Sequence, residues 1–460
     1  MNLPEYNWPI RGGLKPFEHQ MHTTWFVLKY KRCFVLNEMG TGKTLSILWA
    51  LDILFRSKKI RRALVVSPLS TIRLVWANEI FFNMPHRKYA VCHGSRHQRI
   101  QALRNPAEIV IINHDGIKTV FDELDAESFD VIVIDELTAF KSHATERTKA
   151  MIKLAKRAKA VWGLTGEPTP NSPIEAFSQA KIVNPTNPAL PRYFTQYREM
   201  TMTKINEFVW LPKFEAPKVV SRVLTPAIRY KRDECMDLPP TTYQTLEVGL
   251  SEQQQEAYAK MKKHMLLEYQ SGKVTAVNAA VALNKLLQIS AGSVRMDDGT
   301  TLQINCKPRL DALHDIFEQT PQKKLIIFAT YTASIRMLVE YAAKNGIQAQ
   351  PFYGDVNPAH RLQFVDQFQN GKLNWLVMQP QSSAHGLTLV ASSTITWFSL
   401  IASNEYYNQA NARIVRPGQK LNTLIARFVS TPAEKHMADI LDRKDKLSSA
   451  VLELFNNGRL

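Results

Sequence analysis

Asn37-Glu38-Met39-Gly40-Thr41-Gly42-Lys43-Thr44 is the stretch from which the fold of this chain is predicted. It follows a short apolar run at residues 33–36 and leads into residues 45–51, whose apolar side chains have helical spacing. A strand, a glycine-containing turn and a helix, in this order, are the setting that a phosphate-binding loop requires. The sequence therefore predicts a nucleotide site at this stretch.

Several residue types in this loop suit the binding of phosphate. Gly40 and Gly42 let the backbone curl so that successive amide groups face one point, where the helix N-terminus adds partial positive charge. Lys43 is expected to reach the β- and γ-phosphates of ATP, and the Thr44 hydroxyl to hold Mg²⁺. The alternative, a chance Gly-Lys-Thr in a loop, is disfavoured by the flanking strand and helix. The residues predicted to contact the nucleotide here are Met39, Gly40, Thr41, Gly42, Lys43 and Thr44.

The composition is that of a globular protein with a basic excess. A chain of 460 residues, with 45% hydrophobic and 22% charged residues, predicts about two or three domains. The formal charge of +17 favours a polyanionic partner, and nucleic acid is the first candidate. Four cysteines without a CxxC pair predict reduced, mostly buried thiols. With no signal-like N-terminus and no apolar run of membrane-spanning length, we expect a soluble intracellular protein.

Beyond the loop, β-rich runs alternate with helical patterns. Continuous apolar strands separated by helices predict a parallel sheet that is covered on both faces. The functional loops of such a sheet lie at the carboxyl ends of its strands. The strand candidates are Ala63–Ser67, Tyr89–Cys92, Ile109–Asn113, Val131–Ile134 and residues 161–165.

Asp135-Glu136 lies at such a carboxyl end, directly after the strand candidate Val131–Ile134. An aspartate at this position can hold Mg²⁺ through water, and the adjacent Glu136 can polarise the attacking water. Strands followed by Asp-Glu also occur by chance, but the upstream phosphate-binding loop favours a functional pair. Gln20, ahead of that loop, presents a donor and an acceptor together, which suits the N6/N7 edge of adenine.

Further motifs follow one another in order along the first half of the chain. They are Lys15-Pro16-Phe17-Glu18-His19-Gln20, residues 37–44, Ser67-Pro68-Leu69-Ser70 with Trp76 and Glu79, residues 135–141 and residues 164–171. Together they resemble the first RecA-like lobe of the Snf-type ATPases, the chromatin-remodeller branch of the superfamily-two helicases. The chain is compact, like the members of this family that phages and bacteria encode.

Three positions depart from the family's pattern. The aspartate of its phosphate-binding loop is Asn37 here, and the histidine of its Asp-Glu-Ala-His box is Thr138. Both substitutions are compatible with the family's chemistry. The second threonine of its Thr-Gly-Thr-Pro motif is Glu167, which places an acidic group where the coupling of nucleotide to nucleic acid is expected. No role is assigned to Glu167.

A second alternating segment, with strands predicted at residues 323–328, Trp375–Met378 and 394–399, resembles the family's second lobe. Residues 404–419 resemble its Gln-x-x-Gly-Arg-x-x-Arg-x-Gly-Gln signature. Arg413 and Arg416 are three residues apart and are predicted to share one helix face. The resemblance implies that they face the γ-phosphate from the other lobe as arginine fingers. The alternative is that both arginines lie on a solvent-exposed basic face and have no catalytic role. It also assigns Gly386 to nucleotide binding.

The predicted fold class is α/β, with two RecA-like parallel-sheet lobes and helical insertions. Residues 1–235 are expected to form the first lobe, with a helical protrusion near residues 185–235. Residues 236–305 are expected to form a linker and the protrusion of the second lobe. Residues 306–460 are expected to form the second lobe, with the arginine fingers and a C-terminal helix.

The resemblance implies an ATP-dependent DNA translocase that hydrolyses ATP with Mg²⁺ in the cleft between its lobes. The catalytic residues would be Asp135, Glu136, Arg413 and Arg416, and Thr44 and Asp135 would hold the metal. A monomer that tracks duplex DNA in the cytoplasm, or in the host cytoplasm if a phage encodes it, is the expected form. The alternatives are an RNA helicase of the same superfamily and a nucleic-acid-binding scaffold with ATP as a structural ligand. These residues do not distinguish duplex from single-stranded nucleic acid, DNA from RNA, or unwinding from translocation.

Overall fold

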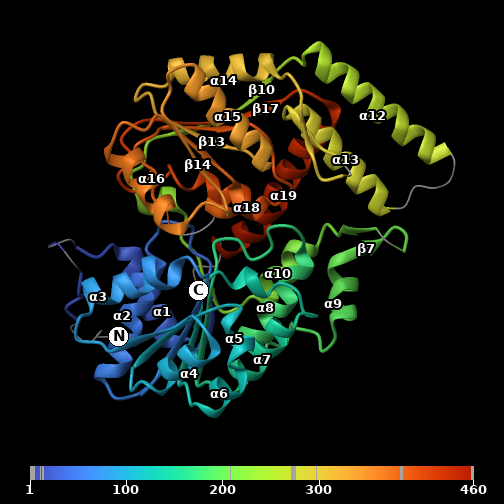
Figure 1. The fold of residues 1–460 in the computed structure, drawn as a ribbon. Helices are drawn as coiled ribbons and strands as arrows, with labels where there is room; N and C mark the ends of the chain where they lie inside the picture. The colour runs from blue at the N-terminus through green and yellow to red at the C-terminus, as the bar shows by residue number, and fades with distance from the viewer. Residues whose placement is uncertain are drawn as a thin grey trace. The chain divides into compact units, whose positions relative to one another are not determined.

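The computed structural model describes residues 6–10, 12, 15–207, 209–270, 276–296, 298–383 and 387–456. The chain forms two compact units, each built around a parallel sheet, as predicted (Figure 1). The first unit comprises Met1–Asp237 together with Lys444–Leu460, and the second comprises Leu238–Arg443. None of the helices in the described part of the chain combines the length and the apolar character that crossing a bilayer requires.

The sheet of the first unit has seven strands in the order β3-β4-β2-β5-β6-β1-β9. The strands are β1 (Arg32–Val35), β2 (Ala63–Ser67), β3 (Tyr89–Cys92), β4 (Ile109–Asn113), β5 (Val131–Ile134), β6 (Ala160–Leu164) and β9 (Ala227–Ile228). The predicted bounds of β2 to β5 are confirmed, while β1 and β6 begin and end one residue earlier than predicted. Every residue of β2, β4, β5 and β6 is buried, which explains why these strands read as continuous apolar runs.

Successive residues of each strand enter different cores, because side chains alternate between the two faces of a sheet. Phe34 belongs to one core and Val35 to the other. The second core is covered by α1 (Glu18–Lys29), α2 (Lys43–Arg56) and α3 (Asn78–Asn83). The first core is covered by α4 (Arg96–Arg104), α5 (Gly116–Thr119), α6 (Phe121–Ala126), α7 (Glu146–Arg157), α8 (Ala176–Val183), α9 (Phe194–Thr201) and α10 (Ala216–Val223).

The protrusion predicted to be helical near residues 185–235 is mixed. It contains α9, α10 and the short α11 (Arg232–Cys235), but also an antiparallel hairpin of β7 (Met202–Lys204) and β8 (Trp210–Pro212). Most residues of this hairpin are exposed. Its sequence therefore does not show the alternation of apolar and polar residues that marks a half-buried strand.

The sheet of the second unit has six strands in the order β10-β17-β16-β13-β15-β14. They are β10 (Thr241–Glu247), β13 (Leu325–Phe328), β14 (Ala349–Phe352), β15 (Trp375–Met378), β16 (Thr394–Trp397) and β17 (Thr423–Val429). The helices of this unit before the C-terminal one are α12 (Glu252–Gln270), α13 (Ala276–Ser290), α14 (Lys307–Gln319), α15 (Thr332–Lys344), α16 (Pro358–Asn370), α17 (Pro380–Ser383) and α18 (Asn404–Asn411), with a small hairpin of β11 (Ser293–Arg295) and β12 (Thr301–Gln303). β10 falls in the stretch assigned to a linker, yet it pairs with β17 along its whole length.

The C-terminal helix α19 (Pro432–Asn456) belongs to both units. Met437 and Leu441 lie in a core of the second unit, whereas Val451 and Leu452 lie in a core of the first. The start of the helix is fixed by a buried ion pair in which Arg309 Nη2 donates to both carboxylate oxygens of Glu434, at 2.8 and 2.9 Å. From the sequence, residues 306–460 were expected to form the second lobe. In the structure, Lys444–Leu460 belong to the first unit instead.

Candidate nucleotide site

The predicted phosphate-binding loop connects the strand β1 to the helix α2, which is the setting that the sequence indicated. Gly40 and Gly42 both have left-handed backbones, with φ of 86° and 78°. The positive φ at Gly42 favours glycine, and a Cβ atom there would lie 1.9 Å from Gln20 Nε2, so that the Gln20 side chain would have to shift. Gly42 is also the N-cap of α2, a helix of 14 residues whose N-terminal amides and partial positive charge therefore lie at the loop.

Lys43 is the first residue of α2, and its ammonium group lies back across the loop. Its Nζ donates to the carbonyls of Asn37 at 2.8 Å and Glu38 at 3.1 Å. The side chain of Thr44, the next residue, is half-buried. A cation and a hydroxyl are thus held at the mouth of the loop, as a phosphate and its metal ion require.

The helix α1 packs against this loop through polar contacts. His19 Nε2 lies 2.8 Å from the carbonyl oxygen of Thr41, and burial lowers the pKa of His19. Asn37 Nδ2 donates to Thr23 Oγ1 at 2.9 Å. Gln20 is buried, and its Oε1 accepts the backbone N–H of Phe17 at 3.1 Å. Gln20 therefore caps α1 in addition to lying against the loop, and its contact with adenine stays a prediction.

A second set of contacts to the loop comes from residues 229–232. Arg229 Nη2 donates to Glu38 Oε1 at 3.1 Å, and the backbone N–H of Arg232 donates to Glu38 Oε2 at 3.1 Å. The N–H of Glu38 donates to the carbonyl of Tyr230 at 3.0 Å. From the sequence, these residues were included in the first lobe and were given no role. No spacing signal links residues so far apart along the chain.

Asp135 directly follows β5, and its carboxylate is held in a defined orientation. Its Oδ2 accepts from Trp76 Nε1 at 2.9 Å and from Ser67 Oγ at 3.1 Å, while its Oδ1 accepts the N–H of Glu136 at 3.1 Å. Glu136 has a left-handed backbone with φ of 50°, which is unfavourable for a residue with a Cβ atom. Such strain clusters at functional sites, so this observation agrees with the predicted role of the pair.

The order of the strands brings the loop and the acidic pair to one edge of the sheet. β6 lies between β5 and β1, so Asp135 and the loop are about two strand spacings, or roughly 10 Å, apart. Thr165 and Gly166 directly follow β6 and lie against the end of β1 and the loop. The N–H of Thr165 donates to Val35 O at 3.1 Å, and a Cβ atom at Gly166 would lie 3.6 Å from Asn37 O.

The residues at this edge fit a magnesium ion that is shared with phosphate. Mg²⁺ is held in such sites by one or two protein oxygens together with phosphate oxygens and water. Thr44 and Asp135 supply that number of protein oxygens. Within the described ranges no cluster of three or more His, Cys, Asp or Glu side chains forms a self-sufficient metal site. The four cysteines are unpaired and three of them are buried, in agreement with the prediction of reduced thiols.

The two arginines of the second unit do not share a helix face, and this prediction is wrong. Helix α18 ends at Asn411, so Arg413 and Arg416 both lie in the turns that follow it. Pro417 disfavours the helical conformation only at Arg416, the residue directly before it. A common acceptor brings the guanidinium groups together instead: the carbonyl of Leu387 accepts from Arg413 Nη1 at 3.1 Å and from Arg416 Nη1 at 2.8 Å.

The two arginines differ in exposure. Arg413 is only 2% exposed, and its Nε donates to Gln409 O at 2.9 Å. Arg416 is half-buried, and its Nη1 also lies 3.1 Å from Thr388 Oγ1. Arg416 is therefore the better placed of the two to meet a ligand, whereas Arg413 also supports the chain at residues 387–389. Gly386, the other residue predicted in this unit, lies outside the described residues.

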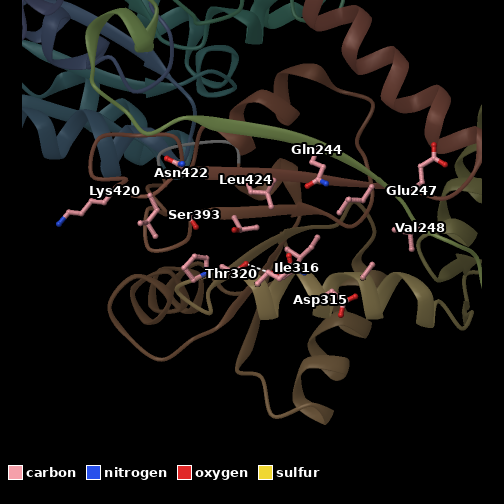
Figure 2. A pocket seen from close by; sticks show the side chains of 16 residues that line it. Gln244, Glu247, Val248, Asp315, Ile316, Thr320, Ser393, Lys420, Asn422 and Leu424 are labelled. Carbon is pink, nitrogen blue, oxygen red and sulfur yellow. Dashed lines mark hydrogen bonds between the residues drawn. The ribbon is translucent and has the colours of Figure 1, made fainter.

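The second unit also has a groove of about 790 Å³ that no predicted site residue lines (Figure 2). It is bounded by β10, α14 and the start of β17. Ser393 and Leu424, which line it, lie at the amino ends of β16 and β17. Ligand sites of α/β sheets lie at the carboxyl ends, so this groove is separate from the candidate nucleotide site.

Comparison with known families fixes the assignment. Residues 19–292, more than half of the chain, match the model of the SNF2-related domain, and residues 308–418 match the model of the helicase conserved C-terminal domain. The chain belongs to the SNF2-related family. The predicted family, the predicted two-lobed α/β fold and the assignment to ATP-hydrolysing, helicase-like enzymes are thereby confirmed.

Several known proteins are similar to this SNF2-related chain. "Putative protein p41" of Acyrthosiphon pisum secondary endosymbiont phage 1 is 26% identical, over 87% of this chain and 88% of that protein. The human "DNA annealing helicase and endonuclease ZRANB3" is 23% identical over 98% of this chain, which spans only 41% of that protein's length. The solved structure "Sulfolobus solfataricus SWI2/SNF2 ATPase core in complex with dsDNA" is 19% identical with a TM-score of 0.47, and the match covers 96% of this chain and 94% of that one.

Proposed function

We propose that this member of the SNF2-related family is an ATP-driven motor that tracks the backbone of DNA, with duplex DNA as its preferred track. The observation that carries the proposal is the meeting of the phosphate-binding loop and the pair Asp135-Glu136 at one sheet edge of the first unit. The formal charge of +17 and the name of the relative ZRANB3, a DNA annealing helicase, support DNA as the track. A motor of this kind mainly holds phosphates and reads little sequence.

The first unit would bind the nucleotide. The ammonium group of Lys43 would exchange the carbonyls of Asn37 and Glu38 for the β- and γ-phosphates, and the N-terminus of α2 would add amide donors. Thr44 and Asp135 would hold Mg²⁺, which neutralises charge that develops on the phosphates when it is bound. Glu136 would accept the proton of the attacking water.

The second unit would supply positive charge for the transition state. Arg416, supported by Arg413, is proposed to contact the γ-phosphate when the nucleotide draws the two units together. Nucleotide binding, hydrolysis and release would then alternate between two arrangements of the units, and this cycle would step the protein along its track.

ATP turnover measured without nucleic acid and with duplex DNA, single-stranded DNA or RNA of equal length tests the proposal. Duplex DNA is expected to give the largest increase in kcat, because the backbone contacts favour the productive arrangement. Stimulation by RNA alone would indicate an RNA helicase. Turnover that no nucleic acid changes would indicate a protein that uses ATP without a nucleic-acid track.

Glu136→Gln is expected to bind ATP with nearly unchanged affinity and to lower kcat by roughly 100-fold, the low end of what a positioned general base contributes. The amide keeps the shape of the side chain but cannot accept a proton. Affinity is measured with a fluorescent ATP analogue, and kcat from steady-state turnover. A matched control is Glu146→Gln, which alters an exposed carboxylate at the start of α7. Loss of nucleotide binding in Glu136→Gln alone would make Glu136 a structural residue.

A further inference from the structure

The carboxylate of Asp135 is oriented by two buried donors. Trp76 Nε1 and Ser67 Oγ both donate to Oδ2, at 2.9 and 3.1 Å, and both residues have 0% exposure. Oδ2 therefore accepts two side-chain hydrogen bonds, whereas Oδ1 accepts the backbone N–H of Glu136. Oδ1 is accordingly the oxygen with acceptor capacity left for a metal-bound water.

The two donors flank one short exposed loop. Ser67 is the last residue of β2, and Trp76 lies in η2 (Ile72–Ala77), a π-helical turn. The residues between them include Leu69, which is 55% exposed, and Ser70, which is also exposed. Turns of π-helix are rare and are frequent at functional sites.

A chain of hydroxyl groups joins the loop to the carboxylate. Thr71 Oγ1 lies 2.5 Å from Ser67 Oγ. Thr71 Oγ1 also donates to the carbonyl of Pro68 at 3.0 Å, and the N–H of Thr71 donates to the same carbonyl at 3.0 Å. The Ser67 hydroxyl, which donates to Asp135, is thus in contact with a residue that the loop backbone holds in place.

We propose that Trp76 and Ser67 are positioning residues that select Oδ1 of Asp135 as the metal-facing oxygen. The proposal rests on the metal-binding role proposed for Asp135, and it does not depend on which nucleic acid the protein tracks.

Trp76→Phe is the informative change, because it keeps an aromatic ring and removes the N–H donor. Side chains that hydrogen-bond to a metal ligand and orient it typically contribute 10- to 100-fold in metal affinity. We therefore expect the Mg²⁺ concentration that half-saturates binding of a non-hydrolysable ATP analogue to rise by roughly 10-fold. Analogue binding in EDTA should be unchanged, because the phosphate-binding loop is untouched. Ser67→Ala, which removes the other donor, should give the same shift with less disturbance of packing.

Trp49→Phe is the matched control. Trp49 is also fully buried, and its Nε1 donates to Pro9 O at 2.8 Å, away from Asp135. It should lose thermal stability to a similar extent and keep the wild-type Mg²⁺ dependence. Unchanged Mg²⁺ dependence in both Trp76→Phe and Ser67→Ala, or an equal change in Trp49→Phe, would overturn the positioning role.

Failure of the positioning role and failure of the proposed function give different results. Analogue binding that requires no Mg²⁺ in the wild-type protein would contradict the metal role proposed for Asp135. A wild-type requirement for Mg²⁺ that neither variant shifts would overturn the positioning role alone.

Discussion

Lys43→Ala is expected to reduce ATP turnover below detection. Lys43 is the basic residue in the first turn of α2, and its Nζ donates hydrogen bonds to the carbonyls of Asn37 and Glu38 in the loop. Without it, the β- and γ-phosphates lose their point charge both in the bound state and in the transition state. Lys43→Arg should not restore turnover, because a planar guanidinium does not replace a compact ammonium group in so tight a loop.

The measurement is steady-state phosphate release together with a thermal unfolding curve. Lys59→Ala is the matched control, since Lys59 is exposed and follows the same helix α2. It should retain wild-type turnover. A folded Lys43→Ala protein that hydrolyses ATP at close to the wild-type rate would remove the basis for a nucleotide site at residues 37–44.

Arg416→Ala is expected to lower kcat by about 10³-fold, the lower end of the range for arginine fingers. An arginine that meets charge developing in the transition state affects the rate more than it affects ground-state binding. The Kd for ATP should therefore change little, because the loop in the first unit still holds the phosphates. Both quantities are obtained from single-turnover rates and from titration with a fluorescent ATP analogue.

Arg413→Ala is expected to lower kcat as well, but with a loss of stability that Arg416→Ala lacks. Arg413 is buried, and its removal leaves the carbonyls of Gln409 and Leu387 without this donor. The double variant should be far less than additive if both arginines serve one phosphate. Lys420→Ala removes an exposed cation nearby and should have no effect. Unchanged kcat in both single variants would show that the arginines are only structural.

The parts of the fold that the sequence predicted are those with a strong local signal. β2 and β5 were bounded correctly because every residue in them is buried and apolar runs end where burial ends. The loop at residues 37–44 was placed correctly because glycine, lysine and threonine at this spacing occur in a strand–helix setting. Both signals are contained in a few neighbouring residues.

The parts that were missed depend on partners distant in the chain. β10 has mostly exposed side chains and becomes a strand because β17 pairs with it. β14 contains Pro351 and Gln350, which weaken its strand pattern, yet it pairs with β15. The contact between Arg229 and Glu38 and the orientation of Asp135 by Trp76 also join separate motifs. No periodicity in one segment reports such pairs.

The second half of α19 has a consequence for biosynthesis. The second unit is an insertion within the chain of the first, because Lys444–Leu460 returns to the first unit. A ribosome that has made residues 1–237 has therefore not yet supplied Val451 and Leu452 to the core they enter. Domains generally fold as units from the N-terminus during synthesis, but this one stays unfinished until the second half of α19 has been made. The nascent first unit is thus expected to expose apolar surface to chaperones while the whole second unit is being synthesised.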